Sequence, residues 1–175
     1  MKRLIAVPVL AAAATLTIAG CSSSKPTIEH GTEHISLSSH SSANDALLQG
    51  TANGPVFSGP GTVRAESNKN NAPLHAFFPG GSFIVYPYGK GGPSSAKTNS
   101  KTCAVKQVGK NQKFTVSSGT GNLQHISGKG TATITFTAVM PRLSNGKCNF
   151  SDSAKPMAGT AFQTVDATIY VRVPR

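Results

Sequence analysis

Two stretches that alternate strictly between apolar and polar residues constrain the fold more than any other feature of the chain. From residue 131 to residue 138, threonine alternates with alanine, isoleucine and phenylalanine. From residue 164 to residue 173, valine, alanine and isoleucine alternate with threonine, aspartate, tyrosine and arginine. A period of two places every second side chain on one face of a β-strand. Both stretches are therefore predicted to be long antiparallel strands with one buried face.

Shorter strand signals surround these two, and turn residues separate them. The shorter candidates are residues 56–57, 62–66, 75–78, 82–86, 104–108 and 113–117. The 18 glycines and 11 prolines of the chain favour tight turns, and no segment after residue 20 has helical periodicity. About eight short strands at this spacing indicate an all-β barrel or sandwich. We expect a single small antiparallel β-barrel with Gly/Pro-rich turns.

The first residues have the features of a bacterial export signal. Two basic residues precede an apolar run over residues 4–18, which is too short to span a bilayer comfortably. The run ends in Ile-Ala-Gly-Cys at residues 18–21, which resembles the bacterial lipobox. The resemblance implies removal of residues 1–20, lipidation of Cys21, and a lipid-anchored location at the cell membrane or envelope after export. The alternative is an ordinary secretory signal with a chance cysteine.

The expected mature chain has two parts. Residues 21–45 contain the lipidated cysteine and eight serines but no aromatic residue, and are predicted to be a flexible tether. Residues 46–175 remain for one β-barrel domain, which is long enough to bury a core. His30, His34 and His40 fall in this tether, where we expect no more than adventitious metal binding. No cofactor is predicted.

Two cysteines, Cys103 and Cys148, remain if Cys21 is lipidated. An even number of cysteines outside the cytoplasm favours a disulfide between them. By closing a loop, the bond would lower the entropy of the unfolded chain and so stabilise the folded protein by about 4 kcal/mol. A metal or redox pair is the alternative, but the two residues lack the usual close spacing.

The charge is strongly positive, with 17 Lys and Arg against six Asp and Glu. No acid occurs between Glu66 and Asp152. Such a surface attracts acidic lipid headgroups or envelope glycans. Nucleic acid is a less expected partner, because the chain is expected outside the cytoplasm and has no nucleic-acid recognition motif. A basic surface without a specific ligand is the alternative. The candidate rim for a ligand or a membrane surface comprises Tyr86, Tyr88, Lys90, Lys97, Lys101, Lys106, Lys110 and Lys113.

The glycine-rich segment over residues 115–136 invites comparison with a phosphate-binding loop. That motif needs four residues between its glycines, Ser or Thr after the lysine, and a helix behind it. Here six residues separate Gly121 from Gly128, Lys129 is followed by Gly130, and a strand pattern comes next. The spacing therefore argues against nucleotide binding.

Two glycine corners are expected in this segment instead, at residues 119–121 and 128–130. Between them, Leu123 and Ile126 are predicted to pack against an open end of the barrel. The sequence SGTGNLQHISGKGTATITF resembles a segment of the dirigent and allene oxide cyclase-like barrels. It is also similar to uncharacterised actinobacterial secreted proteins that continue as residues 137–151 do. The resemblance covers residues 105–151 and implies an eight-stranded antiparallel barrel.

The functional implication of that resemblance is narrower. The plant cyclases and dirigent proteins steer reactive intermediates inside the barrel, but none of their site residues can be placed on this chain. Acids are scarce in the predicted domain, and Asp166 falls on the polar face of its strand. No paired carboxylates or nucleophile motif is visible. These observations make an enzyme less expected than a binding protein.

We therefore expect a non-catalytic, lipid-anchored envelope protein that binds an apolar or amphipathic ligand, or an anionic envelope surface. One alternative is a cyclase- or isomerase-like enzyme, which needs a barrel cavity with an inward polar side chain. Another is a purely structural or adhesive surface antigen, which needs no cavity.

Overall fold

The fold is all-β in a computed structural model that describes residues 28–40, 47–67, 72–89, 92, 94–151 and 153–174. These residues contain one short 3-10 turn, η1 (Gly121–Leu123), and nine strands. The strands are β1 (Ile28–His40), β2 (Leu47–Asn53), β3 (Gly59–Ala65), β4 (Leu74–Phe78), β5 (Gly81–Pro87), β6 (Ser94–Asn99), β7 (Ala104–Ser117), β8 (Ser127–Val139) and β9 (Phe162–Pro174). The prediction of an antiparallel barrel is confirmed.

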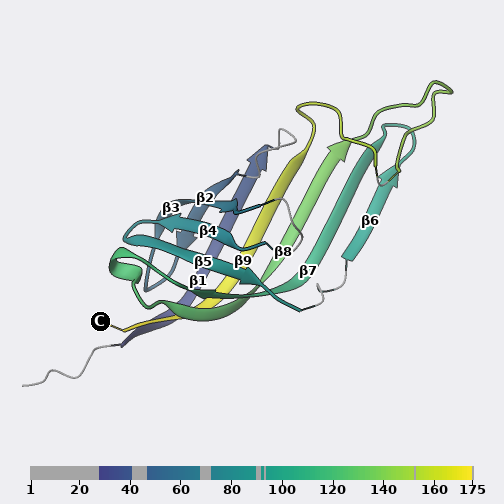
Figure 1. Cartoon of the computed structure of the whole chain (residues 1–175). Helices are drawn as coiled ribbons and strands as arrows, with labels where there is room; N and C mark the ends of the chain where they lie inside the picture. Colours follow the sequence, from purple (N-terminus) through teal and green to yellow (C-terminus); the bar gives the residue numbers. More distant parts are fainter. Residues whose placement is uncertain are drawn as a thin grey trace, which may run out of the picture.

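Hydrogen bonding between β5 and β7 closes the sheet into a barrel. The strand order is β5-β4-β3-β2-β1-β9-β8-β7-β6, with the additional pairing of β5 to β7 (Figure 1). β5 pairs with residues 114–117 of β7, and β6 pairs with residues 104–109 of the same strand. Eight strands therefore form the closed barrel, and β6 extends the sheet beyond it.

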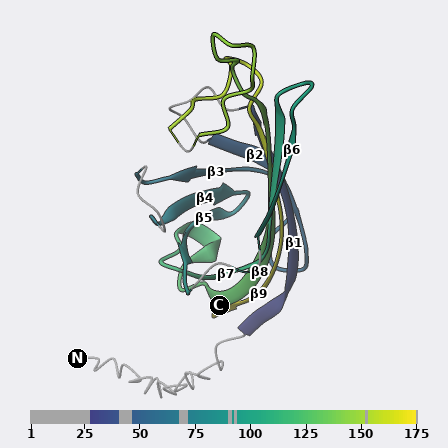
Figure 2. The same cartoon turned by 90° about the vertical axis from the view of Figure 1, so that its right-hand side faces the viewer.

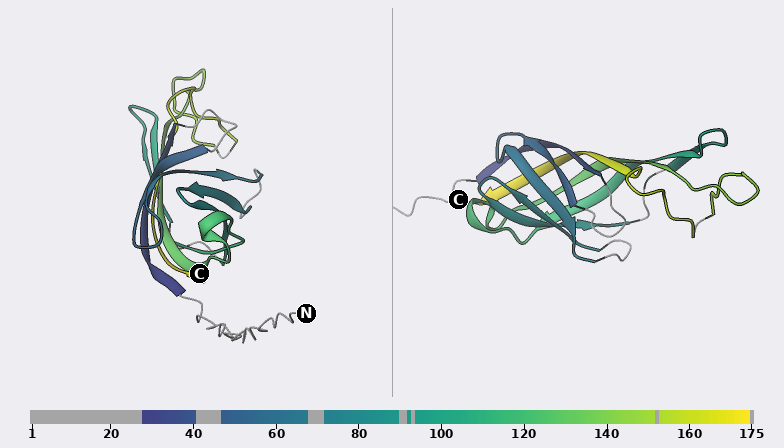
Figure 3. Two further views of the ribbon diagram at one scale, coloured as in Figure 1. Left: turned by 90° about the vertical axis from the view of Figure 1, so that its left-hand side faces the viewer. Right: turned by 90° about the horizontal axis from the view of Figure 1, so that it is seen from above.

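The barrel has a long wall and a short wall. β1, β7, β8 and β9 each contain 13 or 14 residues and form one curved surface, opposite β3, β4 and β5 (Figure 2). The β6–β7 turn and the connection after β8 project from one end, and β9 ends at the other (Figure 3). The two predicted strands at 104–108 and 113–117 are a single strand, because β7 continues through a one-residue bulge between Gly109 and Gln112.

The predicted tether boundary is wrong for residues 28–40. These residues form β1, which pairs with β2 on one side and along its whole length with β9 on the other. The inward face of β1 carries Glu, Gly, Glu, Ile, Leu and Ser in order, so only two of its six positions are large and apolar. That weak pattern explains why the strand was missed. Residues 21–27 and 41–45 of the expected tether lie outside the described residues.

Two further strands, β2 and β6, were also missed, and the predicted strand at 56–57 is wrong. β6 is exposed at every position, so it has no apolar alternation to detect. Residues 56–57 lie in the connection between β2 and β3. The long predicted strands are confirmed as the central parts of β8 and β9, with Ala132, Ala138 and Val165 buried.

The first predicted glycine corner is confirmed and the second is wrong. Gly121 has a φ of +59° where the chain enters η1. Gly130 instead lies within β8, where a Cβ would collide with the carbonyl oxygen of Thr168 and lie 2.8 Å from Cζ of Phe114. The glycine is needed for close approach of two strands and not for a turn. Leu123 and Ile126 are 1% and 2% exposed in the core, as predicted.

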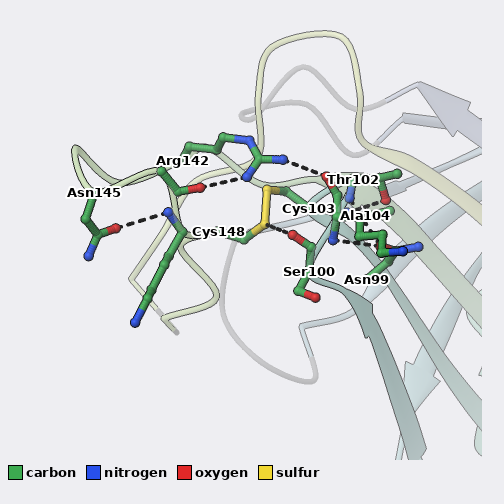
Figure 4. Close-up of a disulfide and its surroundings, with 11 residues drawn as sticks. Asn99, Ser100, Thr102, Cys103, Ala104, Arg142, Asn145 and Cys148 are labelled. Atoms are coloured by element: carbon green, nitrogen blue, oxygen red, sulfur yellow. Dashed lines mark hydrogen bonds between the residues drawn. A yellow bond between two sulfur atoms is a disulfide. The ribbon is translucent and has the colours of Figure 1, made fainter.

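The predicted disulfide between Cys103 and Cys148 is present, with 5.3 Å between the two Cα atoms (Figure 4). It ties the β6–β7 turn to the long connection between β8 and β9. Arg142 reinforces the same junction, because its guanidinium donates to the carbonyl oxygens of Lys101, at 2.6 Å, and Gly146, at 2.7 Å. The bond therefore braces the projecting end of the molecule.

The replacement of both Cys103 and Cys148 by serine is expected to lower the free energy of unfolding by about 2–4 kcal/mol, because the unfolded chain regains loop entropy. Urea unfolding measures the loss, and reduced wild-type protein is the control that should show a similar loss. Two reactive thiols in the untreated native protein would contradict the assignment.

Candidate functional site

The barrel encloses a partly open cavity of about 270 Å³. Its walls are apolar side chains from all eight strands of the closed barrel, among them Ile35, Leu48, Val63, Phe83 and Ile169. Almost every lining residue is aliphatic or aromatic, so the interior offers water few hydrogen-bond partners. This is the typical surface of a site for an apolar ligand.

Small residues on the long wall leave this space open. Ala132 of β8 pairs in register with Ala167 of β9, and Ala167 pairs in turn with Ile35 of β1. Both alanines line the cavity, where larger aliphatic side chains would fill it. The cavity is therefore a consequence of side-chain size at adjacent positions of the wall.

Three phenylalanines form what we call the aromatic floor of the cavity: Phe57, Phe78 and Phe83. The ring centroid of Phe57 lies 5.2 Å from that of Phe78 and 5.4 Å from that of Phe83. Phe78 and Phe83 line the cavity directly, and Phe57 packs behind them at 5% exposure. Such ring pairs contribute specific contacts beyond their buried area. Phe57 comes from the irregular β2–β3 connection, so the floor depends on the position of that segment.

Three polar residues also line the cavity, and we call the side that they form the mouth: Gln112, Lys113 and Gln163. Gln112 and Lys113 lie between the part of β7 that pairs with β5 and the part that pairs with β6. The Gln112 side-chain amide donates to the carbonyl oxygen of Lys110 at 3.2 Å, which supports the bulge. Lys113 is exposed and pairs in register with Thr131, so its side chain lies on the outer face of the barrel, beside the mouth.

The predicted rim residues fall into two separate groups. Tyr86 and Tyr88 are 36% and 44% exposed, and the backbone N–H of Tyr88 donates to the carbonyl oxygen of Lys113 at 3.1 Å. These two tyrosines therefore lie beside the mouth. The lysines of the second group lie on the sheet extension, where Lys97 pairs in register with Lys106. Lys101 is in the β6–β7 turn and Lys110 in the bulge of β7, whereas Lys90 lies outside the described residues.

One buried ionisable residue, Glu33, was missed by the sequence analysis. Its side chain is 0% exposed and faces the barrel interior from β1, in register with Ile169. Oε1 accepts a hydrogen bond of 2.9 Å from the backbone N–H of Val56, but Oε2 has no hydrogen-bond partner. A Cβ on Gly54 would collide with this carboxyl group, so the glycine makes room for it.

Burial raises the pKa of the Glu33 carboxyl above its ordinary value, because desolvation penalises the charged form. The backbone N–H groups of Val56 and Phe57 and the imidazole of His34 oppose this shift in pKa, but their effects are smaller. Glu33 is not among the residues that line the cavity. It lies behind the aromatic floor, next to the segment that carries Phe57.

The other singled-out polar residues have ordinary surface positions. Asp166 is exposed and its carboxylate accepts a 2.6 Å hydrogen bond from the hydroxyl of Ser36, as its outward face predicted. The rings of His30 and Tyr170 meet edge to face, and His34 lies 3.4 Å from the Thr168 hydroxyl. Among the described residues, no three His, Cys, Asp or Glu side chains form a metal-binding group. Cys21, Asp152 and the side chain of His40 lie outside the described part of the chain.

Comparisons with known proteins add no relative. No protein-family model, curated protein or solved structure matches the chain. In the described part of the chain, no helix has the length and apolar character needed to cross a membrane. Function must therefore be argued from the cavity and the residues around it.

The replacement of Glu33 by glutamine is expected to stabilise the protein at pH 7.5 and to change little at pH 4. Because the folded-state pKa is raised, the folded protein binds more protons than the unfolded chain above about pH 4.5, and the wild-type free energy of unfolding falls as the pH rises through the folded-state pKa. Each kcal/mol that the substitution adds to the free energy of unfolding should raise the melting temperature by about 2–4 °C.

Thermal unfolding of both proteins between pH 4 and pH 8.5 measures this difference. Glu66→Gln is the control, because Glu66 is exposed and its neutralisation should leave the pH profile unchanged. Parallel profiles for wild-type protein and Glu33→Gln would contradict the assignment.

Proposed function

We propose that this protein is a non-catalytic, lipid-anchored envelope protein that binds the apolar part of a small amphipathic molecule inside its barrel. The observation that carries the proposal is the cavity of about 270 Å³ with its apolar walls. Apolar surface transferred from water into such a site contributes about 25 cal/mol per Å². The volume lies near the lower end of the usual range for ligand pockets, about 300–1,000 Å³. It suits a medium-length acyl chain or one or two rings.

The mouth favours a ligand with a polar or anionic head. Lys113 carries a positive charge on the outer face beside the mouth, and Gln112 and Gln163 line the cavity itself. A ligand with its chain against the aromatic floor would place its head group beside this cation. After removal of residues 1–20, the chain keeps 15 of its 17 Lys and Arg and all six Asp and Glu. This excess, and the absence of acidic residues between Glu66 and Asp152, would also attract such a ligand.

The same residues favour binding over a reaction in the barrel. Among the described residues, the cavity lining contains no carboxylate, histidine, cysteine or hydroxyl side chain. General acid–base or nucleophilic catalysis needs such a group, or a lysine, within reach of the substrate. Lys113 is the lysine of this lining, and its side chain is exposed on the outer face. Glu33 faces inward, but it lies outside the lining. This supports a binding protein over a cyclase- or isomerase-like enzyme.

The anchor is the part of the proposal that rests on sequence. The lipobox-like end of the signal makes Cys21 the attachment site. An anchored barrel would work next to the membrane, where amphipathic molecules are concentrated. A lipidated cysteine with two or more acyl chains would hold it there stably.

The replacement of Ala132 by phenylalanine is expected to fill the cavity and reduce binding of the fluorescent apolar probe N-phenyl-1-naphthylamine by more than about tenfold, because a benzyl group takes the ligand's space. Fluorescence titration measures the affinity. Thr131→Phe is the matched control, since Thr131 is the neighbouring exposed residue on β8. A wild-type protein that does not bind the probe, decanoate or decanol would overturn the proposal and favour a structural role.

The replacement of Lys113 by glutamine is expected to weaken decanoate binding by about two- to fivefold, the effect of a solvent-exposed ion pair. Decanol has the same chain without the charge, so its affinity should not change. Displacement of N-phenyl-1-naphthylamine measures both affinities. Lys129→Gln serves as the control, because Lys129 is exposed on β8 and does not line the cavity. Equal losses for both lysine variants would indicate general charge attraction and not a head group at the mouth.

A further inference from the structure

The strongest unexplained feature of the molecule is a carboxyl group buried behind the cavity floor. Glu33 is fully buried, and its Oε2 atom has no hydrogen-bond partner. A buried polar atom without a partner costs free energy, and an ionised carboxylate costs far more. The fold accommodates this side chain at a specific place, because Gly54 leaves it the space that a Cβ would occupy.

The carboxyl group holds the segment that carries part of the aromatic floor. Its Oε1 atom accepts a hydrogen bond of 2.9 Å from the backbone N–H of Val56, and the backbone N–H of Phe57 also interacts with the carboxyl. The ring of Phe57 then packs on Phe78 and Phe83, which line the cavity. A continuous path of contacts therefore leads from Glu33 through one short connection to the ligand site.

The groups around Glu33 provide little compensation for a negative charge. Ile169 faces it from β9, and the β2–β3 connection presents Gly54, Pro55, Val56 and Phe57, none of which titrates. On β1, Glu29 shares the inward face and His34 is the next residue. The imidazole of His34 opposes the rise in the pKa of Glu33, and its effect is smaller than that of burial.

We propose that Glu33 is a proton-controlled latch on the cavity floor. While the carboxyl group is neutral, the Gly54–Phe57 segment stays closed over it, with Phe57 behind Phe78 and Phe83, because no charge is buried beneath the segment. When Glu33 ionises, Oε2 requires water, and the irregular β2–β3 connection is the covering element that can admit it without breaking a strand pairing. The segment then opens, Phe57 leaves the floor, and the cavity loses part of its apolar wall. For the ligand, this inference rests on the proposed function; for the segment itself, it does not.

Hydrogen exchange at the backbone amides of Val56 and Phe57 tests the latch without any ligand. In wild-type protein, the protection of these amides, corrected for intrinsic exchange rates, should fall as the pH rises from 5 to 8.5. The protection should fall about tenfold for each unit by which the pKa of the Glu33 carboxyl in the closed form exceeds its pKa in the open form. Glu33→Gln should keep the amides protected throughout, whereas Glu29→Gln, on the same strand and face, should behave as wild type.

A carboxyl carbon NMR titration of wild-type Glu33 makes the test independent of any variant. The midpoint at which the carboxyl group ionises should coincide with the loss of protection at Val56 and Phe57. Ionisation of Glu33 without any change in protection would overturn the latch, and so would pH-independent protection in a wild-type protein whose Glu33 titrates.

Titration of N-phenyl-1-naphthylamine across the same pH range separates the latch from the proposed function. Tighter binding to wild-type protein at pH 5 than at pH 8.5, with a constant affinity for Glu33→Gln, supports both. No binding at any pH, together with pH-dependent protection of the two amides, would refute the ligand site and leave the latch standing. Constant binding together with constant protection would refute the latch and leave the ligand site standing.

Discussion

The hydrogen-bonded pairing of β5 with β7 is the constraint on which the rest of the structure depends. It joins Ile84–Pro87 to residues 114–117 and turns an open sheet into a closed barrel. Closure pairs the edge of β5 with the C-terminal part of β7 and brings the inward faces of eight strands together around one interior. Because β5 occupies only the C-terminal part of β7, the rest of β7 is free to pair with β6. The mouth of the cavity lies at this point of divergence.

The interior combines two features that stable cores usually avoid, an unfilled apolar space and a buried carboxyl group. The unfilled space follows from small residues such as Ala132 and Ala167 at adjacent wall positions. Glu33 adds a group whose charged form is penalised by burial and only partly compensated by backbone N–H donors. Both features cost stability, and the aromatic floor lies between them. A protein that only needed to be rigid would gain stability by filling the space and replacing the acid.

The sequence predicted correctly the strands whose own residues alternate between apolar and polar side chains. It missed the features that depend on contacts between different strands. β8 and β9 alternate so regularly that their buried faces could be named from the sequence, and the cysteine count gave the disulfide between Cys103 and Cys148. β1 was missed because glycine, glutamate and serine occupy most of its inward face, and its glutamate was therefore placed in a tether. Two glycines in β8 were read as a corner because close strand approach leaves no local pattern.

The sequence by itself determined an all-β chain with two long amphipathic strands, a disulfide and a strongly basic surface, because period-two patterning, cysteine number and charge are local or additive properties. Only the tertiary structure decided that the barrel is partly hollow, that the predicted rim divides into two groups, and that Glu33 is buried behind three phenylalanines. Each of these depends on which residues of different strands meet across the barrel. Strand register and barrel closure determine that pairing, and the sequence of a single strand specifies neither.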